Sequence, residues 1–358
     1  MSITCLKAYL IFFAVIKIAF WSLLYIRLLF YKKASSDKQE ISFSTVICLK
    51  NDAEHLNNLE TLADQAGLHE LVLVDDFSND QTKKEISRIY SKRIKKIHAS
   101  IDKPGKKQAL LDGIKVASCD NIVVTDIDCR PASSNWGFKM SNPLFNGYDL
   151  VLGYGPYYKK PGLLNKFIRF ETLMTAIQYF SYALINIPYM GVGRNMAYKK
   201  ELFKKHNGFQ KFGHIASGDD DLFVQMVYKE AKIYAQLDPA SFTYSVPKTT
   251  MISFFKQKQR HVTTASSYNF LHKICLGLFA FSHIMFYISI FICLLMEQKG
   301  FATMIYLLTI IPIWIIYMMI SSKFKEGDLR IWFPFLDIIY FIYMVVLFPA
   351  TLLKKKTW

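Results

Sequence analysis

Short apolar segments alternate with helical patterns between residues 41 and 269, and polar turns bound each apolar segment. Four segments are predicted to be strands: 43–48, 70–74, 96–99 and 122–125. The stretches that carry a helical pattern between them are 54–65, 81–90 and 106–117. Alternation of this kind predicts an α/β fold with a mainly parallel sheet and right-handed crossovers. Further along, strands are expected at 150–153 and 195–198, and a helix near Asp219.

The start of the chain has the composition of a membrane-spanning helix. A bilayer is crossed by about 20 consecutive apolar residues, and residues 9–30 reach that length, although Lys17 interrupts them. Lys32 and Lys33 follow. By the positive-inside rule they predict a retained signal anchor whose C-terminal end faces the cytoplasm. Residues 34–40 are predicted to form a short polar linker.

The C-terminal quarter returns to membrane composition. Segments 274–296 and 301–320 are each long enough to span a bilayer, and a tight loop joins them. A third candidate, 331–353, contains Asp337 and two prolines. As a span it would leave the lysines at 354–356 outside, against the positive-inside rule. A re-entrant or interfacial placement therefore stays open. The apolar segment 163–187 is also either a buried helix or an interfacial one.

The composition limits which classes of binding partner the protein is expected to have. The chain is 52% hydrophobic and carries a formal charge of +16. That combination favours a membrane protein that meets anionic lipids or anionic substrates over a soluble enzyme. We expect no nucleic-acid partner, because the sequence has no zinc-ligand spacing and no RNA-binding aromatic pattern. The six cysteines are scattered, without a C-x-x-C, which predicts neither a disulfide framework nor a zinc site.

A pair of aspartates ends the fourth predicted strand. Asp126 and Asp128 lie one residue apart in the stretch NIVVTDIDCR, residues 121–130. In an extended chain, residues i and i+2 point the same way, so both carboxylates would face one spot where open α/β sheets bind ligands. Two hard oxygen ligands suit Mg²⁺ or Mn²⁺ carrying a substrate's phosphates. The alternative, for such a pair taken alone, is a surface turn.

Charged residues also follow the second and third predicted strands. Asp75 and Asp76 end the second strand, where a carboxylate can accept hydrogen bonds from a ribose or a base. Simple capping of the next helix is the alternative. Lys106 and Lys107 open the helix after the third strand, behind Gly105, and either could neutralise a diphosphate. An exposed basic turn is the alternative there.

Three consecutive aspartates stand at the predicted helix start near residue 219. Adjacent like charges raise at least one pKa unless a cation or hydrogen-bond donors compensate. A carboxylate poised in this way can take a proton from an acceptor hydroxyl. Helix capping explains one or two of the aspartates, and three is more than capping needs.

A basic element precedes the C-terminal membrane segments. In the stretch 257–261 (QKQRH), Arg260 offers a guanidinium fork for diphosphate oxygens, and His261 offers a ring for stacking. A patch for anionic lipid is the alternative.

Together and in this order, the four sites resemble those of membrane-bound family 2 glycosyltransferases, which have the GT-A fold and include hyaluronan and cellulose synthase-like enzymes. The resemblance covers roughly residues 45–264. The family's Asp-Asp-x-Ser element matches 75–78, and its Asp-x-Asp element matches 126–128. Its base motif falls on 218–222, which makes Asp219 or Asp220 the base. Its Gln-x-x-Arg-Trp motif resembles 257–261, with histidine in place of tryptophan.

The resemblance implies a Rossmann-like GT-A domain at 41–270, between a signal anchor at 1–33 and a membrane region at 271–358. It also implies a set of site residues. Asp126 and Asp128 would hold the metal, Mg²⁺ or Mn²⁺. The residues implied to bind the donor are Asp75, Asp76, Lys106, Lys107, Asp126, Gln257, Arg260 and His261. Those implied to bind the acceptor are Gly191, Gly193, Arg194 and Asn195.

These implications make the chain an inverting, metal-dependent hexosyltransferase at the cytoplasmic face of the cell (inner) membrane. Its donor would be a nucleotide-sugar, above all a UDP-sugar. Its acceptor would be a lipid-linked molecule or a growing glycan. The protein would also contact membrane lipids. Three alternatives stay open: a processive synthase, a non-catalytic scaffold with a degenerate domain, and a membrane nucleotidyltransferase. The last would not explain the Asp219 cluster or Arg260.

Overall fold

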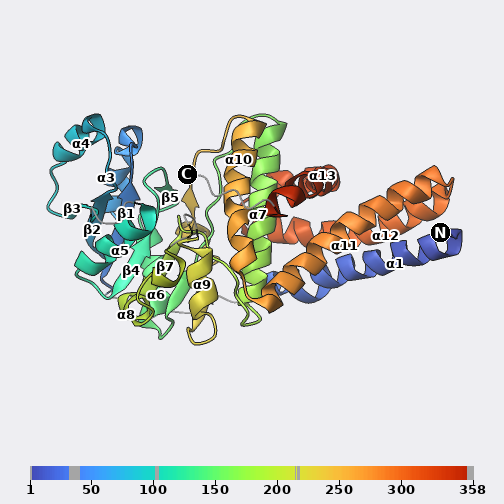
Figure 1. The fold of residues 1–358 in the computed structure, drawn as a ribbon, viewed down its shortest axis with the longest axis horizontal. Coiled ribbons are helices and arrows are strands. Elements are labelled where there is room, and N and C mark those ends of the chain that lie inside the picture. The colour runs from blue at the N-terminus through green and yellow to red at the C-terminus, as the bar shows by residue number, and fades with distance from the viewer. Residues whose placement is uncertain (1, 32–40, 101–104, 214, 216–217, 353–358) are drawn as a thin grey trace. The chain divides into compact units, whose positions relative to one another are not determined.

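The structure is a computed structural model that describes residues 2–31, 41–100, 105–213, 215 and 218–352. The chain forms two compact units (Figure 1). The sheet unit comprises Lys32–Tyr158 and Ala183–Pro247, and the helical unit comprises Met1–Tyr31, Lys159–Tyr182 and Lys248–Trp358. Each unit is thus built from separate stretches of chain, and the domain boundaries at residues 33, 41 and 270 stay predictions. The predicted linker 34–40 and the lysines 354–356 lie outside the described residues.

A seven-stranded sheet forms the core of the sheet unit, in the order β3-β2-β1-β4-β7-β6-β8. Its strands are β1 (Phe43–Leu49), β2 (Leu68–Asp75), β3 (Ile94–His98), β4 (Asn121–Val124), β6 (Leu150–Leu152), β7 (Met196–Lys199) and β8 (Ile233–Ala235). All neighbours pair in parallel except β7, which is antiparallel to β4 and to β6. The predicted α/β fold with a mostly parallel sheet is therefore confirmed. A second, two-stranded sheet pairs β5 (Arg130–Pro131) with β9 (Thr243–Tyr244).

Helices pack on the central strands because small residues let them approach. The helices of the sheet unit are α3 (Asn58–Ala63), α4 (Asp80–Ser87), α5 (Lys106–Val116), α6 (Trp136–Phe145), α8 (Lys200–Lys205) and α9 (Asp221–Val227). The 3₁₀ turns are η2 (Ala53–His55), η3 (Gln210–Phe212) and η4 (Pro239–Ser241). Gly113 of α5 lies against Val46 and Val74, and Gly137 of α6 against Phe43. A side chain at either glycine would overlap these neighbours, so both positions fix how closely helix and sheet approach.

The prediction of a single helix at 54–65 is wrong. The chain forms η2, then a turn, and then the shorter α3. Asn58, at the start of α3, is buried and donates a hydrogen bond to the backbone carbonyl of Ile127, 2.8 Å away. Its side-chain oxygen accepts one from Arg130 Nε. An asparagine used in this way competes with a continuous helix.

Within the residues that the structure describes, the helical unit contains four helices that are long and apolar enough to cross a membrane. They are Ile3–Phe30, Phe270–Leu295, Lys299–Lys323 and Gly327–Leu347. The first consists of α1 (Ile3–Ala19), the π-helical η1 (Phe20–Tyr25) and α2 (Arg27–Phe30). The others are α11 (Phe270–Leu295), α12 (Lys299–Lys323), and η6 (Gly327–Trp332) with α13 (Phe333–Leu352).

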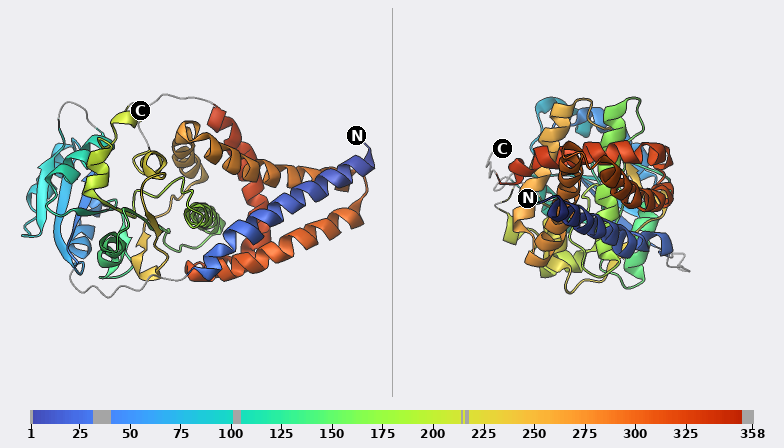
Figure 2. Two further views of the ribbon diagram at one scale, coloured as in Figure 1. Left: turned by 90° about the horizontal axis from the view of Figure 1, so that it is seen from below. Right: turned by 90° about the vertical axis from the view of Figure 1, so that its right-hand side faces the viewer.

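The last of these helices lies differently from the other three. Helices α1, α11 and α12 run side by side, whereas α13 crosses them (Figures 1 and 2). Helix α13 contacts α11 and α12 and also α10 (Met251–Val262), which η5 (Thr263–Ser267) joins to α11. The third C-terminal candidate is therefore a helix, but one that does not run parallel to the predicted hairpin.

Buried ion pairs explain the charges within the apolar segments. Lys17 of α1 donates to Asp337 of α13 over 2.6 Å, and each side chain is 1% exposed. The Tyr287 hydroxyl of α11 donates to the same carboxylate over 2.5 Å. Because each charge has a partner of opposite sign, neither stands alone in an apolar surrounding.

The predicted segment 163–187 forms α7 (Leu163–Ala183), and most of its side chains are buried. Its two charged residues find partners within the helical unit. Arg169 donates to Glu326 and to Asp328, with its Nε 2.9 Å from the Glu326 carboxylate. Glu171 pairs with Lys258 of α10 and accepts a hydrogen bond from Tyr343, 3.3 Å away. These ionic contacts join α7 to α10 and to the C-terminal helices.

Candidate active site

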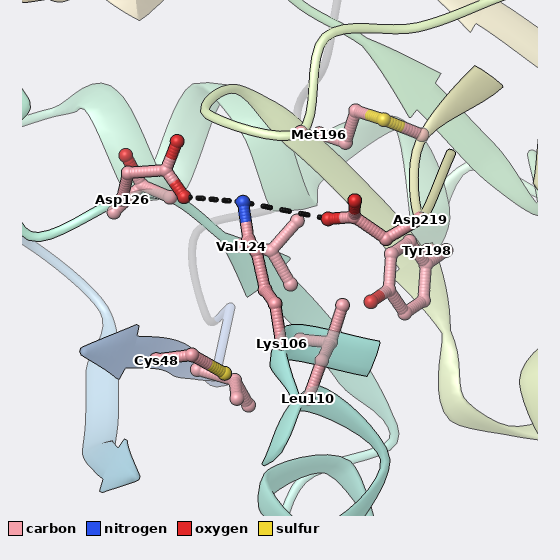
Figure 3. Close-up of a pocket in the computed structure, with 11 residues that line it drawn as sticks. Cys48, Lys106, Leu110, Val124, Asp126, Met196, Tyr198 and Asp219 are labelled. Atoms are coloured by element: carbon pink, nitrogen blue, oxygen red, sulfur yellow. Dashed lines mark hydrogen bonds and ion pairs between the residues drawn. The ribbon is translucent and has the colours of Figure 1, made fainter. Parts of the chain in front are cut away.

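A pocket in the sheet unit lies where β1 and β4 end, beside the first turn of α5 (Figure 3). The residues that line it are Val46, Cys48, Lys106, Leu110, Val124, Thr125, Asp126, Gly193, Met196, Tyr198 and Asp219. Four of these, Lys106, Asp126, Gly193 and Asp219, come from separate predicted motifs. The fold thus brings together residues that are far apart in the sequence, at the sheet edge where parallel strands bind ligands.

Lys106 connects two of the acidic motifs. Its ammonium nitrogen lies 2.7 Å from Asp126 Oδ1 and 3.4 Å from Asp219 Oδ2 (Figure 3). Burial lowers the pKa of Lys106, but the charges of Asp126 and then Asp219 outweigh this effect, so its pKa lies well above the usual value. Lys106 is therefore a permanent cation between two carboxylates.

Asp126 and Asp128 lie close together, but not for the reason that the sequence suggested. Strand β4 ends at Val124, and residues 126–129 form a turn in which the Cys129 amide donates to the Asp126 carbonyl over 3.1 Å. One ligand atom from each of Asp126, Asp128 and Cys129 lies within 4.8 Å of the others. Burial, followed by the charge of Asp126, raises the pKa of Asp128. Two carboxylates that destabilise each other's charge fit a divalent cation with oxygen ligands.

Asp75 and Asp76 are both buried at the end of β2. Asp75 accepts hydrogen bonds from the Ser78 amide, 3.0 Å away, and from His98 Nδ1, 3.2 Å away. Asp76 accepts one from the amide of Gly105 over 2.9 Å. Gly105 is the N-cap of α5 and has a φ of 139°, so Asp76 fixes the turn that delivers Lys106.

The three consecutive aspartates have different surroundings. Asp219 lines the pocket and faces Lys106. Asp220 is the N-cap of α9, and its carboxylate accepts hydrogen bonds from the amides of Gly193 and Asp221, each over 2.8 Å. Burial, followed by the charges of Asp219 and Asp221, raises the pKa of Asp220 to about 7. Asp219 therefore faces the pocket, whereas Asp220 holds the loop at Gly193.

Residues 191–195 form the loop before β7, and its polar side chains have partners within the sheet unit. The Arg194 guanidinium donates to the carbonyl of Gly155 and lies over the ring of Tyr157. Asn195 is fully buried and accepts a hydrogen bond from Trp136 Nε1 over 2.9 Å. At Gly191, a Cβ would lie 2.7 Å from the Met196 sulfur, whereas Gly193 lines the pocket with its backbone.

The remaining predicted donor residues belong to the helical unit. Gln257, Arg260 and His261 lie on α10, where the first is half-buried and the other two are exposed. Lys258, between them in the sequence, points to Glu171 of α7. Lys107 belongs to the sheet unit but does not line the pocket with Lys106.

The sequence prediction missed Cys48 and Tyr198, which line the pocket. Cys48 is the last residue of a predicted central strand, and that position was the signal that could have found it. Tyr198 belongs to β7, whose antiparallel pairing with β4 brings it to the site. Its ring is buried, and its hydroxyl has no hydrogen-bond partner among the residues that the structure describes.

Comparison with known proteins agrees with this geometry. Residues 44–206 match Glycosyl transferase family 2. The mannosyltransferase PcManGT from Pyrobaculum calidifontis, solved with GDP-Man and Mn²⁺, aligns over 91% of this chain and 99% of its own. The TM-score is 0.56 and the identity 16%, so this likeness concerns the fold. The fold is of the GT-A type that glycosyltransferases use. Residues 44–206, somewhat less than half of the chain, match this family of glycosyltransferases, and the described part of the chain also contains helices long enough to span a membrane.

Two further solved structures are more distant. GalNAc-T7 with UDP, GalNAc and Mn²⁺ has a TM-score of 0.44 at 15% identity, over 59% of this chain and 45% of its own. S. aureus TarS has a TM-score of 0.42 at 16% identity, and the alignment covers 68% of this chain and 42% of TarS. Both likenesses are too weak to carry an argument. No match was found among curated proteins.

Proposed function

We propose that the protein is an inverting, metal-dependent transferase that moves a sugar from a nucleotide-sugar donor to a lipid-linked or glycan acceptor. The observation that carries this proposal is the convergence of Lys106, Asp126 and Asp219 in one pocket. This convergence of cationic and anionic groups from three motifs supports a site that binds a diphosphate beside an acceptor hydroxyl. The fold relative from P. calidifontis was solved with GDP-Man. UDP-sugars, which the sequence favours, and GDP-sugars are therefore both candidates.

Asp126 and Asp128 are the residues that we propose as metal ligands. Their carboxylate oxygens are the ligands that Mg²⁺ and Mn²⁺ prefer. When bound, the metal offsets the negative charge that builds on the leaving nucleoside diphosphate. Burial already disfavours the charged form of Asp128, and a bound divalent cation would restore it. The Mn²⁺ in the PcManGT structure supports this choice of ion.

Three residues of the pocket have distinct proposed roles. Lys106, a permanent cation, neutralises the diphosphate. Asp219 takes the proton of the acceptor hydroxyl, which attacks the sugar from the face opposite the diphosphate. Gly193 offers close approach of the acceptor, because its Cα faces Asp219 and Asp220 without a side chain. From the sequence resemblance, Arg260 of α10 is proposed to assist with the diphosphate.

We propose that this reaction takes place at the cytoplasmic face of the cell membrane. The four long apolar helices support a membrane location, and Lys32 and Lys33 favour a cytoplasmic sheet unit. The test is protease accessibility in vesicles of known orientation. The sheet unit should be cleaved in inside-out vesicles and protected in right-side-out spheroplasts, and the reverse pattern would contradict the placement.

A donor screen in native membranes tests the proposed activity. Membranes containing the protein should release UDP or GDP from one nucleotide-sugar with Mn²⁺ or Mg²⁺, above the level of membranes without it. Asp128→Asn should reduce that release at least 100-fold. The matched control is Asp64→Asn, because Asp64 is an exposed carboxylate at the end of α3. Equal release by Asp128→Asn and wild type would refute the proposed metal site. Product length separates single addition from processive synthesis.

A further inference from the structure

Two consecutive lysines open α5, and their side chains go to different places. The Lys106 ammonium lies in the pocket between Asp126 and Asp219. The Lys107 ammonium instead donates hydrogen bonds to two backbone carbonyls, those of Phe212 and Ile215, over 2.9 and 2.7 Å. Phe212 ends η3, and Ile215 precedes Asp219 by four residues. Lys107 thus joins the first turn of α5 to Phe212 and Ile215, which precede the three aspartates in the sequence.

The chemistry of Lys107 suits this contact. An ammonium group has three N–H donors, and two of them are used on these carbonyls. The side chain is half-buried. Burial lowers the pKa of Lys107, and the nearby charges of Asp219 and Asp221 counter part of this effect. Hydrogen bonds from a charged donor are about twice as strong as neutral ones, so the contact holds the backbone firmly.

We propose that Lys107 is a positioning residue that fixes the Asp219 carboxylate against Lys106, rather than a ligand of the donor diphosphate. The first turn of α5 then carries two lysines with different roles. Lys106 is the cation in the pocket, and Lys107 positions the chain before the proposed base, Asp219. The inference rests on the proposed function, because it assigns Asp219 the role of base. It also separates two lysines that the sequence could not distinguish.

Lys107 and Asp220 hold two different stretches of chain beside the acidic cluster. Asp220 fixes the far side of the acidic cluster, through the amide of Gly193. The near side, where the chain enters the cluster, is held at Phe212 and Ile215 by Lys107. Among the described residues, the Asp219 carboxylate lies 3.4 Å from the Lys106 ammonium, and loss of the Lys107 contacts would loosen the chain that precedes it. A base displaced by as little as about 1 Å loses on the order of 100-fold in rate.

Kinetics of three variants of the full-length protein test the proposal. Lys107→Met should lower kcat for transfer at least 10-fold and leave the donor KM within twofold of wild type. Lys107→Arg, whose fork can donate to the same carbonyls, should recover kcat to within threefold. Lys106→Met is the comparison. It should raise the donor KM, and the Kd for UDP or GDP with Mn²⁺, at least 10-fold. A Lys107→Met variant that raises the donor KM in the same way, or changes neither constant, would overturn the proposal.

Hydrogen–deuterium exchange tests the contact without any turnover. In Lys107→Met, the peptide that carries Phe212 and Ile215 should exchange at least fivefold faster than in wild type, whereas Lys106→Met should leave it unchanged. Lys107→Gln, with a single neutral donor group, should exchange at an intermediate rate and serves if the methionine variant does not fold. Unchanged exchange in both Lys107 variants would sink the proposal. If the wild-type protein releases no nucleotide but the Lys107 variants still exchange faster, only the proposed function is refuted.

Discussion

The buried ion pair between Lys17 and Asp337 gives a sharp prediction about the helical unit. Both side chains are 1% exposed, their charged atoms are 2.6 Å apart, and Tyr287 donates to the same carboxylate. Removing one partner leaves the other charge buried and unpaired, which costs about 3–5 kcal/mol. Lys17 also lies over the rings of Phe286 and Tyr287, at 5.0 and 4.7 Å. These contacts add about 1 kcal/mol to the loss for the lysine variant.

A double-mutant cycle measures this prediction. Lys17→Met and Asp337→Asn should each lower the unfolding free energy in detergent micelles by about 3–5 kcal/mol, and the double variant should cost far less than their sum. Denaturant unfolding followed by tryptophan fluorescence provides the assay. The control is Glu85→Gln, which breaks the exposed pair between Glu85 and Arg88 at 2.7 Å and should cost under about 1 kcal/mol. Additive losses in the cycle would refute the reasoning.

Three further predictions concern the sheet unit. The pKa of Asp220 in the folded chain is raised to about 7, above its value in the unfolded chain. Protonation of Asp220 therefore stabilises the fold. This contribution to the free energy of unfolding is fully present below about pH 4 and is lost as the pH rises to about 7. Asp220→Asn should therefore flatten that part of the stability–pH curve in metal-free buffer, and an unchanged curve would contradict the assignment. Asn195→Ala should lower the melting temperature, by the equivalent of about 2–4 kcal/mol, because the side chain bonds Trp136, Tyr154 and Ser241. A large change in acceptor KM with an unchanged melting temperature would instead favour a binding role. Gly113→Ala should cost about 1–3 kcal/mol in chemical denaturation, since its Cβ would lie 2.5 Å from Val46 and 2.8 Å from Val74; a stabilised variant would contradict the packing.

Local patterns in the sequence predicted the parallel half of the sheet well. Strands β1, β2, β3 and β4 are apolar runs bounded by turns, and such runs are visible without tertiary information. Of the later strands, β6 and β7 were also expected, at 150–153 and 195–198, but the sequence indicated neither the direction of β7 nor the presence of β8. Strand β8 has three residues, and β7 runs against its neighbours. Strand direction depends on how the intervening chain is routed, and no short pattern encodes that.

The sequence predicted which charged residues form the candidate site, but not the local structure that holds them. The acidic residues appear in the sequence as conspicuous clusters, so their meeting at one sheet edge could be expected. The position of Asp126 and Asp128 could not, because the spacing of the pair did not decide between a strand end and the alternative, a turn, which is what the structure shows. Nor could Lys106 be told from Lys107. Adjacent helical residues point about 100° apart, and their partners lie 20 and 105 residues away in the chain.

Metal dependence of nucleotide release tests the central claim most directly. Purified protein is assayed with its best nucleotide-sugar in excess EDTA and then with Mn²⁺ added back, as wild type and as Asp219→Asn. We expect release by wild type to fall to background in EDTA and to return with Mn²⁺, and Asp219→Asn to stay near background throughout. Full release in EDTA, or wild-type release by Asp219→Asn, would contradict a divalent ion and a carboxylate base acting together in this pocket.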